Sequence, residues 1–188
     1  MGFKISREGK LFLLKTARNS IKDKLYGTAT DCGEAPEGLD FMSGCFVTIH
    51  LRKRLRGCIG NFRDDIGIVE NVKDMARQAA FADPRFGPVS KDEFAMCELE
   101  ISVLSPMIPA DAEEITVGRD GIYIIKGYNR GVLLPQVAQE HYWDRETFLE
   151  QTCVKAGLPQ DAYKDKDTTI FRFEALVFGD GNLYRSEE

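Results

Sequence analysis

The chain has 188 residues, 43% of them hydrophobic and 29% charged, which is typical of a globular protein able to bury a core without disulfides. The net charge of −5 disfavours a nucleic-acid-binding protein, because phosphate recognition needs clustered positive charge. No apolar run is long enough to cross a bilayer, and the first residues lack the apolar run of a signal peptide. We therefore expect a cytoplasmic protein that has no membrane segment.

The cysteine and histidine content gives no sign of a metal site. The five cysteines are odd in number and widely spaced, with no C-x-x-C pair, so we expect reduced thiols. Only His50 and His141 are available to complete a zinc site. The chain also has no Gly-rich dinucleotide loop and no phosphate loop. We therefore expect neither a metal nor a cofactor.

The first half of the chain predicts a helix, a β-hairpin, a second helix and a strand. Ser6 can cap the first helix, and Gly27 can end it. Asp83-Pro84 stops the second helix, because proline cannot continue it. In chain order, these elements are a helix over 6–26, strands over 44–51 and 55–62, a helix over 68–80 and a strand over 94–105.

The second half predicts the same types of element in the same order. Pro135 suits the first turn of a short helix. Asp144 can cap a further helix that Gly157 closes. The predicted elements are a hairpin with its short helix over 121–138, a helix between Asp144 and Gly157, and a strand over 168–178.

This similarity between the halves predicts an internal duplication. Arg56-Gly57 aligns with Arg130-Gly131 at an offset of 74 residues, and Glu100 aligns with Glu174 at the same offset. We therefore expect an α+β fold of two related lobes, each a hairpin–helix–strand unit, with a mainly antiparallel sheet flanked by helices.

The two lobes would form one domain over 1–188. They would span about 41–108 and 118–180, with the N-terminal helix packing on them. Similar lobes would place their hairpins near a shared seam, and such seams are common ligand sites. The sequence thus predicts a cleft between lobes as the functional site.

Cys58 is the sharpest candidate for chemistry. It lies between Gly57 and Gly60, just after basic residues, and nearby cations favour the reactive thiolate. Alternation along a strand would put Arg56 and Cys58 on one face. The two glycines would let a ligand or a second backbone approach closely. The alternative is that Cys58 is a small apolar residue packed in the sheet and never ionised.

His50 is the histidine best placed to pair with Cys58, and the hairpin register decides whether it does. A three-residue turn, Arg52–Arg54, would set Thr48 opposite Cys58 and make His50 a diagonal neighbour on the same face. A two-residue turn, Lys53-Arg54, would slip the register and move His50 to the other face. The alternative for His50 is an exposed residue at a strand end.

Two further arginines could hold an anionic substrate. Arg85 follows the helix stop at Pro84, and its alternative is a local ion pair with Asp83. Arg130 occupies the position equivalent to Arg56, so the two guanidinium groups could converge on one carboxylate or phosphate, or could be two surface residues.

Other charged runs have simpler explanations. Glu98 and Glu100 alternate with Ser102 on one predicted strand, where carboxylates could serve acid–base work but more often form the wet face of a sheet. The basic run 52–54 could bind nucleic acid, although a solvated hairpin tip explains it better.

Six blocks of the chain resemble the AMMECR-type domain family, and they occur in the family's order across nearly the whole chain. They are LRGCIG at 55–60, FVTI at 46–49, DPRF at 83–86, LEISVLS at 99–105, RGVLLPQVA at 130–138 and KAGLP at 155–159. The resemblance implies a two-part α+β protein. It also implies a prokaryotic gene setting, the AmmeMemoRadiSam system, beside a Memo-like protein that resembles ring-cleaving dioxygenases and a radical S-adenosylmethionine protein. It supplies no settled reaction.

Three functional hypotheses follow. The first is a cytoplasmic enzyme or enzyme partner that handles a small anionic ligand, with Cys58 as nucleophile or covalent anchor and Arg56 and Arg130 as anion contacts. The second is a non-catalytic adaptor for the Memo-like and radical proteins. The third is a nucleic-acid or translation-linked role through the basic tip, which the acidity of the chain disfavours.

Overall fold

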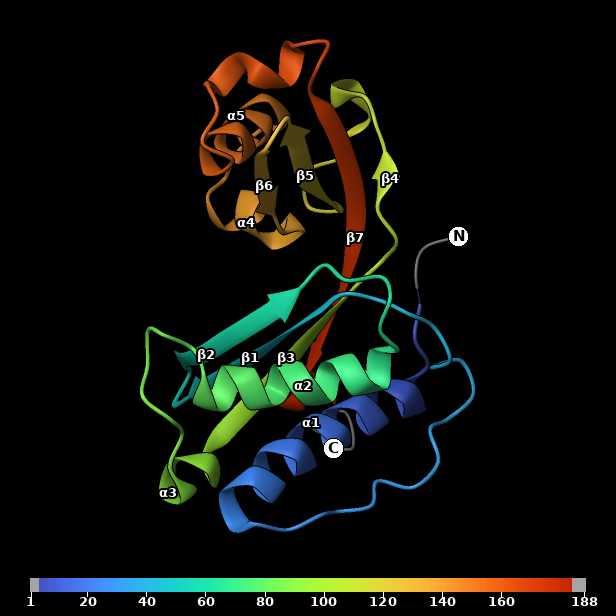
Figure 1. Cartoon of the computed structure of the whole chain (residues 1–188), viewed down its shortest axis with the longest axis vertical. Helices are drawn as coiled ribbons and strands as arrows, with labels where there is room; N and C mark the ends of the chain where they lie inside the picture. The colour runs from blue at the N-terminus through green and yellow to red at the C-terminus, as the bar shows by residue number, and fades with distance from the viewer. Residues whose placement is uncertain (1–3, 184–188) are drawn as a thin grey trace. The chain divides into compact units, whose positions relative to one another are not determined.

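The computed structural model describes residues 4–183, and the chain divides into two structural units (Figure 1). Among the described residues, unit 1 holds 4–104 and 176–183, and unit 2 holds 105–175. The last long strand, β7 (Thr169–Gly179), runs from unit 2 into unit 1. The units therefore differ from the expected lobes, because Leu176 and Phe178 near the end of this strand pack in the unit 1 core.

Unit 1 contains an antiparallel sheet with two helices packed on one face. The middle strand β1 pairs with β2 on one side and with β3 on the other, and the last residues of β7 lie beyond β3. Figure 1 shows α1 and α2 lying along this sheet. The elements are α1 (Arg7–Tyr26), β1 (Cys45–Leu51), β2 (Arg54–Asn61), α2 (Ile68–Phe81), α3 (Lys91–Phe94), β3 (Cys97–Leu104) and α6 (Asp180–Leu183).

Alternation along β1 decides which side chains meet the helices. Val47 and Ile49 are buried in one cluster with Leu13 of α1 and Val72 of α2. Thr48 and the other residues of opposite parity therefore point to the second face of the sheet, the face turned away from α1 and α2.

The predicted ends of both long helices are confirmed. The Ser6 hydroxyl accepts a hydrogen bond from the Gly9 amide at 3.0 Å, and Gly27 ends α1 with a left-handed φ of 68°. The helix α2 ends at Phe81, two residues before Asp83-Pro84.

The hairpin between β1 and β2 has a register that neither predicted turn describes. Its turn has two residues, Arg52 and Lys53, with φ of 50° and 64°. An irregularity between Ile49 and His50 then leaves Arg56 as an extra residue on β2. The bulge restores the pairing of Thr48 with Cys58, which the three-residue turn predicted.

Unit 2 contains a second antiparallel sheet with a helix packed on it. Its strand order is β6-β5-β7, with β4 on the other side of β7. Asp144 caps α5 by accepting from the Thr147 amide at 2.8 Å, and Gly157 follows the helix with φ of 73°, as predicted. The elements are β4 (Ile108–Pro109), η1 (Ala112–Glu114), β5 (Asp120–Lys126), β6 (Asn129–Leu133), α4 (Pro135–Glu140), α5 (Arg145–Lys155) and η2 (Gln160–Lys164).

The predicted mixed α+β fold with an antiparallel sheet is confirmed. In each unit the third strand pairs with the first strand of the hairpin, β3 with β1 and β7 with β5. A Cβ on Gly57 would lie 2.2 Å from the Ala79 carbonyl oxygen, and one on Gly131 would lie 2.7 Å from that of Thr152. At both positions the absence of a side chain thus lets the backbone of a helix pack directly against the strand. When the two units are aligned by the pairing of their strands, Glu100 corresponds to Phe171 and not to Glu174. A common origin of the units therefore stays a prediction.

One predicted strand begins later than expected. Phe94 lies in the short helix α3, and β3 starts at Cys97. The helix forms because the Ser90 hydroxyl accepts from the Glu93 amide at 3.2 Å, while the Glu93 carboxylate accepts from the Ser90 amide at 2.9 Å.

Candidate functional site

Cys58 lies half-buried on β2, with its side chain on the second face of the unit 1 sheet. It pairs with Thr48 across the hairpin, and the Thr48 hydroxyl donates to the Cys58 sulfur at 3.3 Å. The sulfur therefore has a fixed hydrogen-bond donor beside it.

The segment after α2 closes the outer edge of β2 at Cys58. The Cys58 amide donates to the Asp83 carboxylate at 2.9 Å, and the Arg85 guanidinium donates to the Cys58 carbonyl at 3.1 Å. Arg85 also donates to Asp83 at 3.0 and 2.8 Å, so the local ion pair that was the alternative explanation for Arg85 is present. These two side chains supply the donor and acceptor that a further strand would otherwise provide.

The two side chains of the Asp83–Arg85 ion pair differ in their exposure to solvent. The Asp83 side chain is 1% exposed, whereas that of Arg85 is 54% exposed. Hydrogen bonds from Arg85, together with those from the backbone amides of Cys58 and Arg85, hold the pKa of the Asp83 carboxyl well below its usual range. Asp83 is thus a fixed negative charge beneath a guanidinium group that still faces solvent.

Arg56 is fully engaged within unit 1. Its guanidinium donates to both carboxylate oxygens of Glu93, at 2.9 and 3.1 Å, and to the carbonyls of Gly87 and Pro88, at 2.9 and 3.2 Å. The side chain is only 14% exposed. This arrangement makes Arg56 a clamp that ties β2 to the chain before α3.

The glycines of the hexapeptide are explained by packing. Gly57 is the position at which the backbone of α2 at Ala79 touches β2, so a second backbone approaches there. A Cβ on Gly60 would lie 2.3 Å from the Phe46 ring, which packs edge-on against Phe62.

His50 lies on the second face, diagonal to Cys58, in the register described above. Its strand neighbours are Leu55 and Glu98, and within the described residues no hydrogen bond joins it to Cys58. Glu100 pairs with Thr48, so a carboxylate stands in the same row as Cys58. Arg130 is exposed on β6 of unit 2, opposite Ile125.

Burial separates Cys58 from most of the other cysteines, all of which are free. Burial raises the pKa of the Cys45 thiol to about 12 and also raises those of Cys97 and Cys153. Only Cys32 shares the half-buried state of Cys58, and its sulfur accepts from the side-chain Nδ2 of Asn19 at 3.5 Å.

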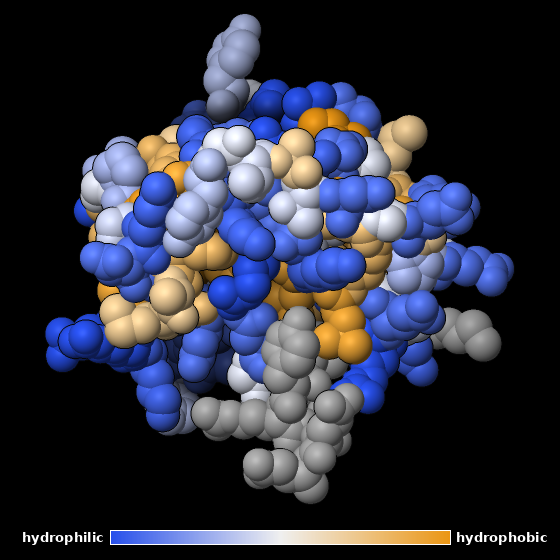
Figure 2. Space-filling model, turned by 90° about the horizontal axis from the view of Figure 1, so that it is seen from below, coloured by the Kyte–Doolittle hydropathy of each residue, from blue (hydrophilic) through white to orange (hydrophobic). Residues whose placement is uncertain are grey.

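A candidate metal group and a membrane-spanning helix are both absent from the described residues. Across 4–183, no three His, Cys, Asp or Glu side chains are grouped so that they could hold a metal ion. No helix in the same part of the chain is long and apolar enough to cross a membrane. Figure 2 shows one face of the molecule, where hydrophilic side chains cover most of the surface and apolar areas are small.

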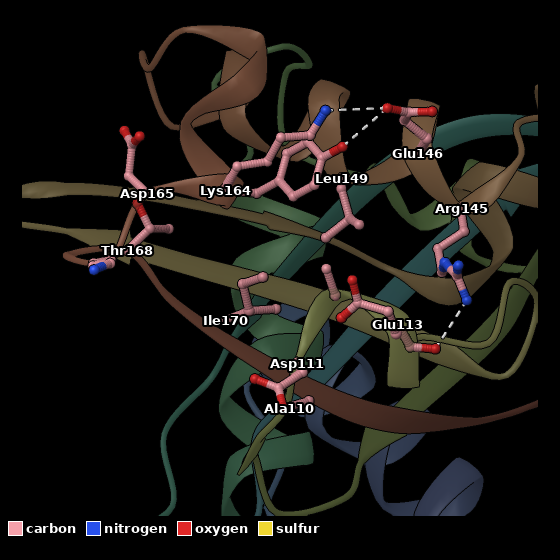
Figure 3. A pocket seen from close by; sticks show the side chains of 13 residues that line it. Ala110, Asp111, Glu113, Arg145, Glu146, Leu149, Lys164, Asp165, Thr168 and Ile170 are labelled. Atoms are coloured by element: carbon pink, nitrogen blue, oxygen red, sulfur yellow. Dashed lines mark hydrogen bonds and ion pairs between the residues drawn. The ribbon is translucent and has the colours of Figure 1, made fainter.

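Unit 2 has a cavity of its own, of about 700 Å³, between η1, α5 and the chain before β7 (Figure 3). Leu149 and Ile170 give it an apolar floor. At the rim, Lys164 and Tyr163 donate to Glu146, at 3.2 and 3.3 Å, so these charges are already paired. The segments that form the cavity are distant in sequence, which is why no motif indicated it.

The sequence missed two contributors to the Cys58 region. Glu93 had a usable signal, because S-x-x-E at 90–93 is the pattern of a capping box. Thr48 appeared only as a register partner, and nothing in the sequence indicated that its hydroxyl meets the sulfur.

Comparisons with known proteins match nearly the whole chain to one family. The AMMECR1 family model matches residues 14–178. A protein of Methanothermobacter thermautotrophicus is 39% identical over 183 residues, covering 93% of this chain and 95% of the relative. Protein MJ0810 of Methanocaldococcus jannaschii is 38% identical, covering 93% and 91%.

A solved structure shows the same similarity. The crystal structure of the uncharacterized protein PH0010 from Pyrococcus horikoshii matches with a TM-score of 0.83 and 39% identity, covering 97% of this chain and 96% of that one. These names assign no activity. The chain belongs to the AMMECR1 family.

Proposed function

We propose that this protein handles a small anionic metabolite at Cys58, as an enzyme or as the partner of one, in the cytoplasm. The observation that supports this is the grouping at one residue of a half-buried thiol, a hydroxyl directed at its sulfur and a largely exposed guanidinium bound to its carbonyl. Cys58 acts as nucleophile or covalent anchor, and Thr48 orients the sulfur.

Arg85 takes the role of anion contact in this proposal. The Nε and Nη2 groups of Arg56 donate to Glu93, and its other hydrogen bonds go to backbone carbonyls. Arg56 therefore stabilises β2 and does not contact the ligand. Arg85 keeps a largely exposed guanidinium group, which donates to the Cys58 carbonyl. Roles for His50 and Arg130 stay predictions.

Alkylation by a charged and a neutral reagent tests the proposal. Iodoacetate and iodoacetamide both place a carbon on the thiolate sulfur and release iodide, but only iodoacetate is an anion. In a Cys32→Ser background, we expect Cys58 to react in the folded protein, with the iodoacetate rate favoured about threefold or more relative to free cysteine. Added salt should remove this preference.

Two variants separate charge from structure. Arg85→Gln should abolish the preference for iodoacetate, whereas Arg85→Lys should retain most of it. Since Arg85 also neutralises the buried Asp83, circular dichroism is needed to show that each variant is folded. Reaction of Cys58 only after unfolding, or a preference unchanged by salt and by Arg85→Gln, would overturn the proposal.

A non-catalytic adaptor is the second candidate, and one observation favours it. Arg56, Gly57 and Gly60 of the hexapeptide are all accounted for by contacts within unit 1. An adaptor for Memo-like and radical S-adenosylmethionine proteins would co-purify with them equally well after Cys58→Ala, and the activity of that assembly would not change. An assembly that loses its activity on Cys58→Ala supports the first candidate.

A further inference from the structure

A groove lies at the tip of the β1–β2 hairpin, within unit 1 and apart from the contacts of Cys58. Its volume is about 670 Å³, which is within the range of small-molecule sites. It is bounded by the hairpin tip on one side and by the connection from α3 to β3 on the other. The lining residues are Leu51, Arg52, Arg54, Leu55, Arg56, Glu93 and Met96.

The charge of the groove is positive and unbalanced. Among residues 4–183, no ion pair engages Arg52 or Arg54, and both are exposed. The one carboxylate in the lining, Glu93, already holds a bidentate ion pair with Arg56. Two free guanidinium groups therefore remain for an anion in a chain whose net charge is −5.

Apolar side chains are exposed beside these cations. Leu55 is 43% exposed and Met96 is 48% exposed, and both line the groove. Methionine adapts its shape to many apolar groups, which suits a binding surface. A ligand that covers both side chains would remove apolar area from water while its charge meets the arginines.

The backbone of the turn supplies an independent argument. Arg52 and Lys53 are the consecutive turn residues with φ of 50° and 64°, the left-handed region in which side chains are disfavoured. Two-residue hairpins of this kind strongly prefer Asn-Gly, which adopts these angles at little cost. The chain thus keeps Arg52, which lines the groove, at a position where a side chain strains the backbone, and such strain is concentrated at functional sites.

We propose that this groove binds a small carboxylate with an apolar body, such as an aryl or medium-chain alkyl carboxylic acid. The carboxylate is held by Arg52 and Arg54, and the body covers Leu55 and Met96. The site does not depend on Cys58 chemistry, so its test is independent of the function proposed above.

Amide NMR titration with 4-phenylbutyrate tests this assignment. We expect saturable shifts at residues 51–56 and at Met96. The neutral 4-phenylbutanol should bind at least about threefold more weakly, and 4-phenylbutylamine should give no saturation, because it places a cation beside two cations. Arg54→Gln should weaken 4-phenylbutyrate binding by about threefold or more.

A turn variant makes the test independent of folding defects. Arg52→Asn/Lys53→Gly relieves the left-handed strain, so Tm should rise by about 2–6 °C while 4-phenylbutyrate binding weakens. The control Lys155→Gln/Lys166→Gln also removes two positive charges, but from exposed positions of unit 2, and should leave 4-phenylbutyrate binding unchanged. A variant that binds 4-phenylbutyrate more weakly and has a higher Tm has lost binding for a reason other than a folding defect.

Three results would overturn the proposal. One is the absence of saturable shifts around the groove with 4-phenylbutyrate. A second is tighter binding of an acidic peptide with an apolar residue, acetyl-Glu-Glu-Leu-Phe-amide, which would assign the groove to a protein partner. The third is tighter binding of a single-stranded RNA octamer at the same residues with a steep salt dependence, which would assign it to nucleic acid.

Discussion

Replacing Gly57 by alanine should destabilise unit 1 strongly, because the new Cβ has no space. It would lie 2.2 Å from the Ala79 carbonyl oxygen and 3.1 Å from the Ala79 carbonyl carbon. Favourable contacts between heavy atoms need about 3.5 Å, so β2 and α2 must separate by about 1 Å. The clashing atoms belong to the backbone of a helix whose Ala76, Ala79 and Ala80 are buried, so no side-chain rotation relieves the clash.

Such overpacking costs about 1–3 kcal/mol, and we expect a value near 3 kcal/mol because two backbones are involved. Urea unfolding followed by circular dichroism should show a midpoint lowered by about 1–2 M. Gly87→Ala is the matched control, since nothing lies within 4 Å of its added Cβ. A Gly57→Ala midpoint equal to that of Gly87→Ala would refute the proposed contact between β2 and α2.

Three further predictions concern the Arg56–Glu93 contact in unit 1 and the cap of α5 in unit 2. Arg56→Lys keeps the charge but loses the fork that binds Glu93, so the unfolding free energy should fall by about 1–3 kcal/mol in urea titrations, and an unchanged value would contradict the clamp. Hydrogen bonds from Arg56 and from the Ser90 amide lower the pKa of Glu93 from 4.5 to about 2, so the stability it contributes is present above pH 4.5 and is lost as the pH falls towards 2. Thermal melts should therefore show a smaller loss of Tm between pH 5 and pH 3 for Glu93→Gln than for the parent, and parallel losses would count against this linkage. Asp144→Ala should cost about 1 kcal/mol by removing the cap of α5, while Asp144→Ser should cost little, and equal losses would show that the cap is unimportant.

Most of the fold was predictable because its signals are local. Ser6, Gly27 and Asp144 act on neighbouring backbone groups, so their residue types and positions were enough to place helix ends. The strands were recognisable from β-branched and aromatic runs. The helix α3 was missed because an alternating apolar pattern continued through Phe94, although the pattern Ser90-x-x-Glu93 preceded it.

The candidate site was less predictable, because it depends on register and on long-range partners. A bulge at Arg56 decides that Thr48 faces Cys58, and a bulge has no reliable signature in a single sequence. The engagement of Arg56 by Glu93 joins residues 37 positions apart. Sequence reasoning named Arg56, Arg85 and Arg130 as possible anion contacts, but it gave no sign that Glu93 occupies Arg56.

Alkylation of the native protein with iodoacetamide, followed by peptide mass spectrometry, tests the central claim most directly. We predict modification of Cys58 and Cys32 in the folded state, with Cys45, Cys97 and Cys153 protected until the protein is unfolded. Protection of Cys58 to the same extent as the three buried cysteines would contradict a reactive thiol at this site.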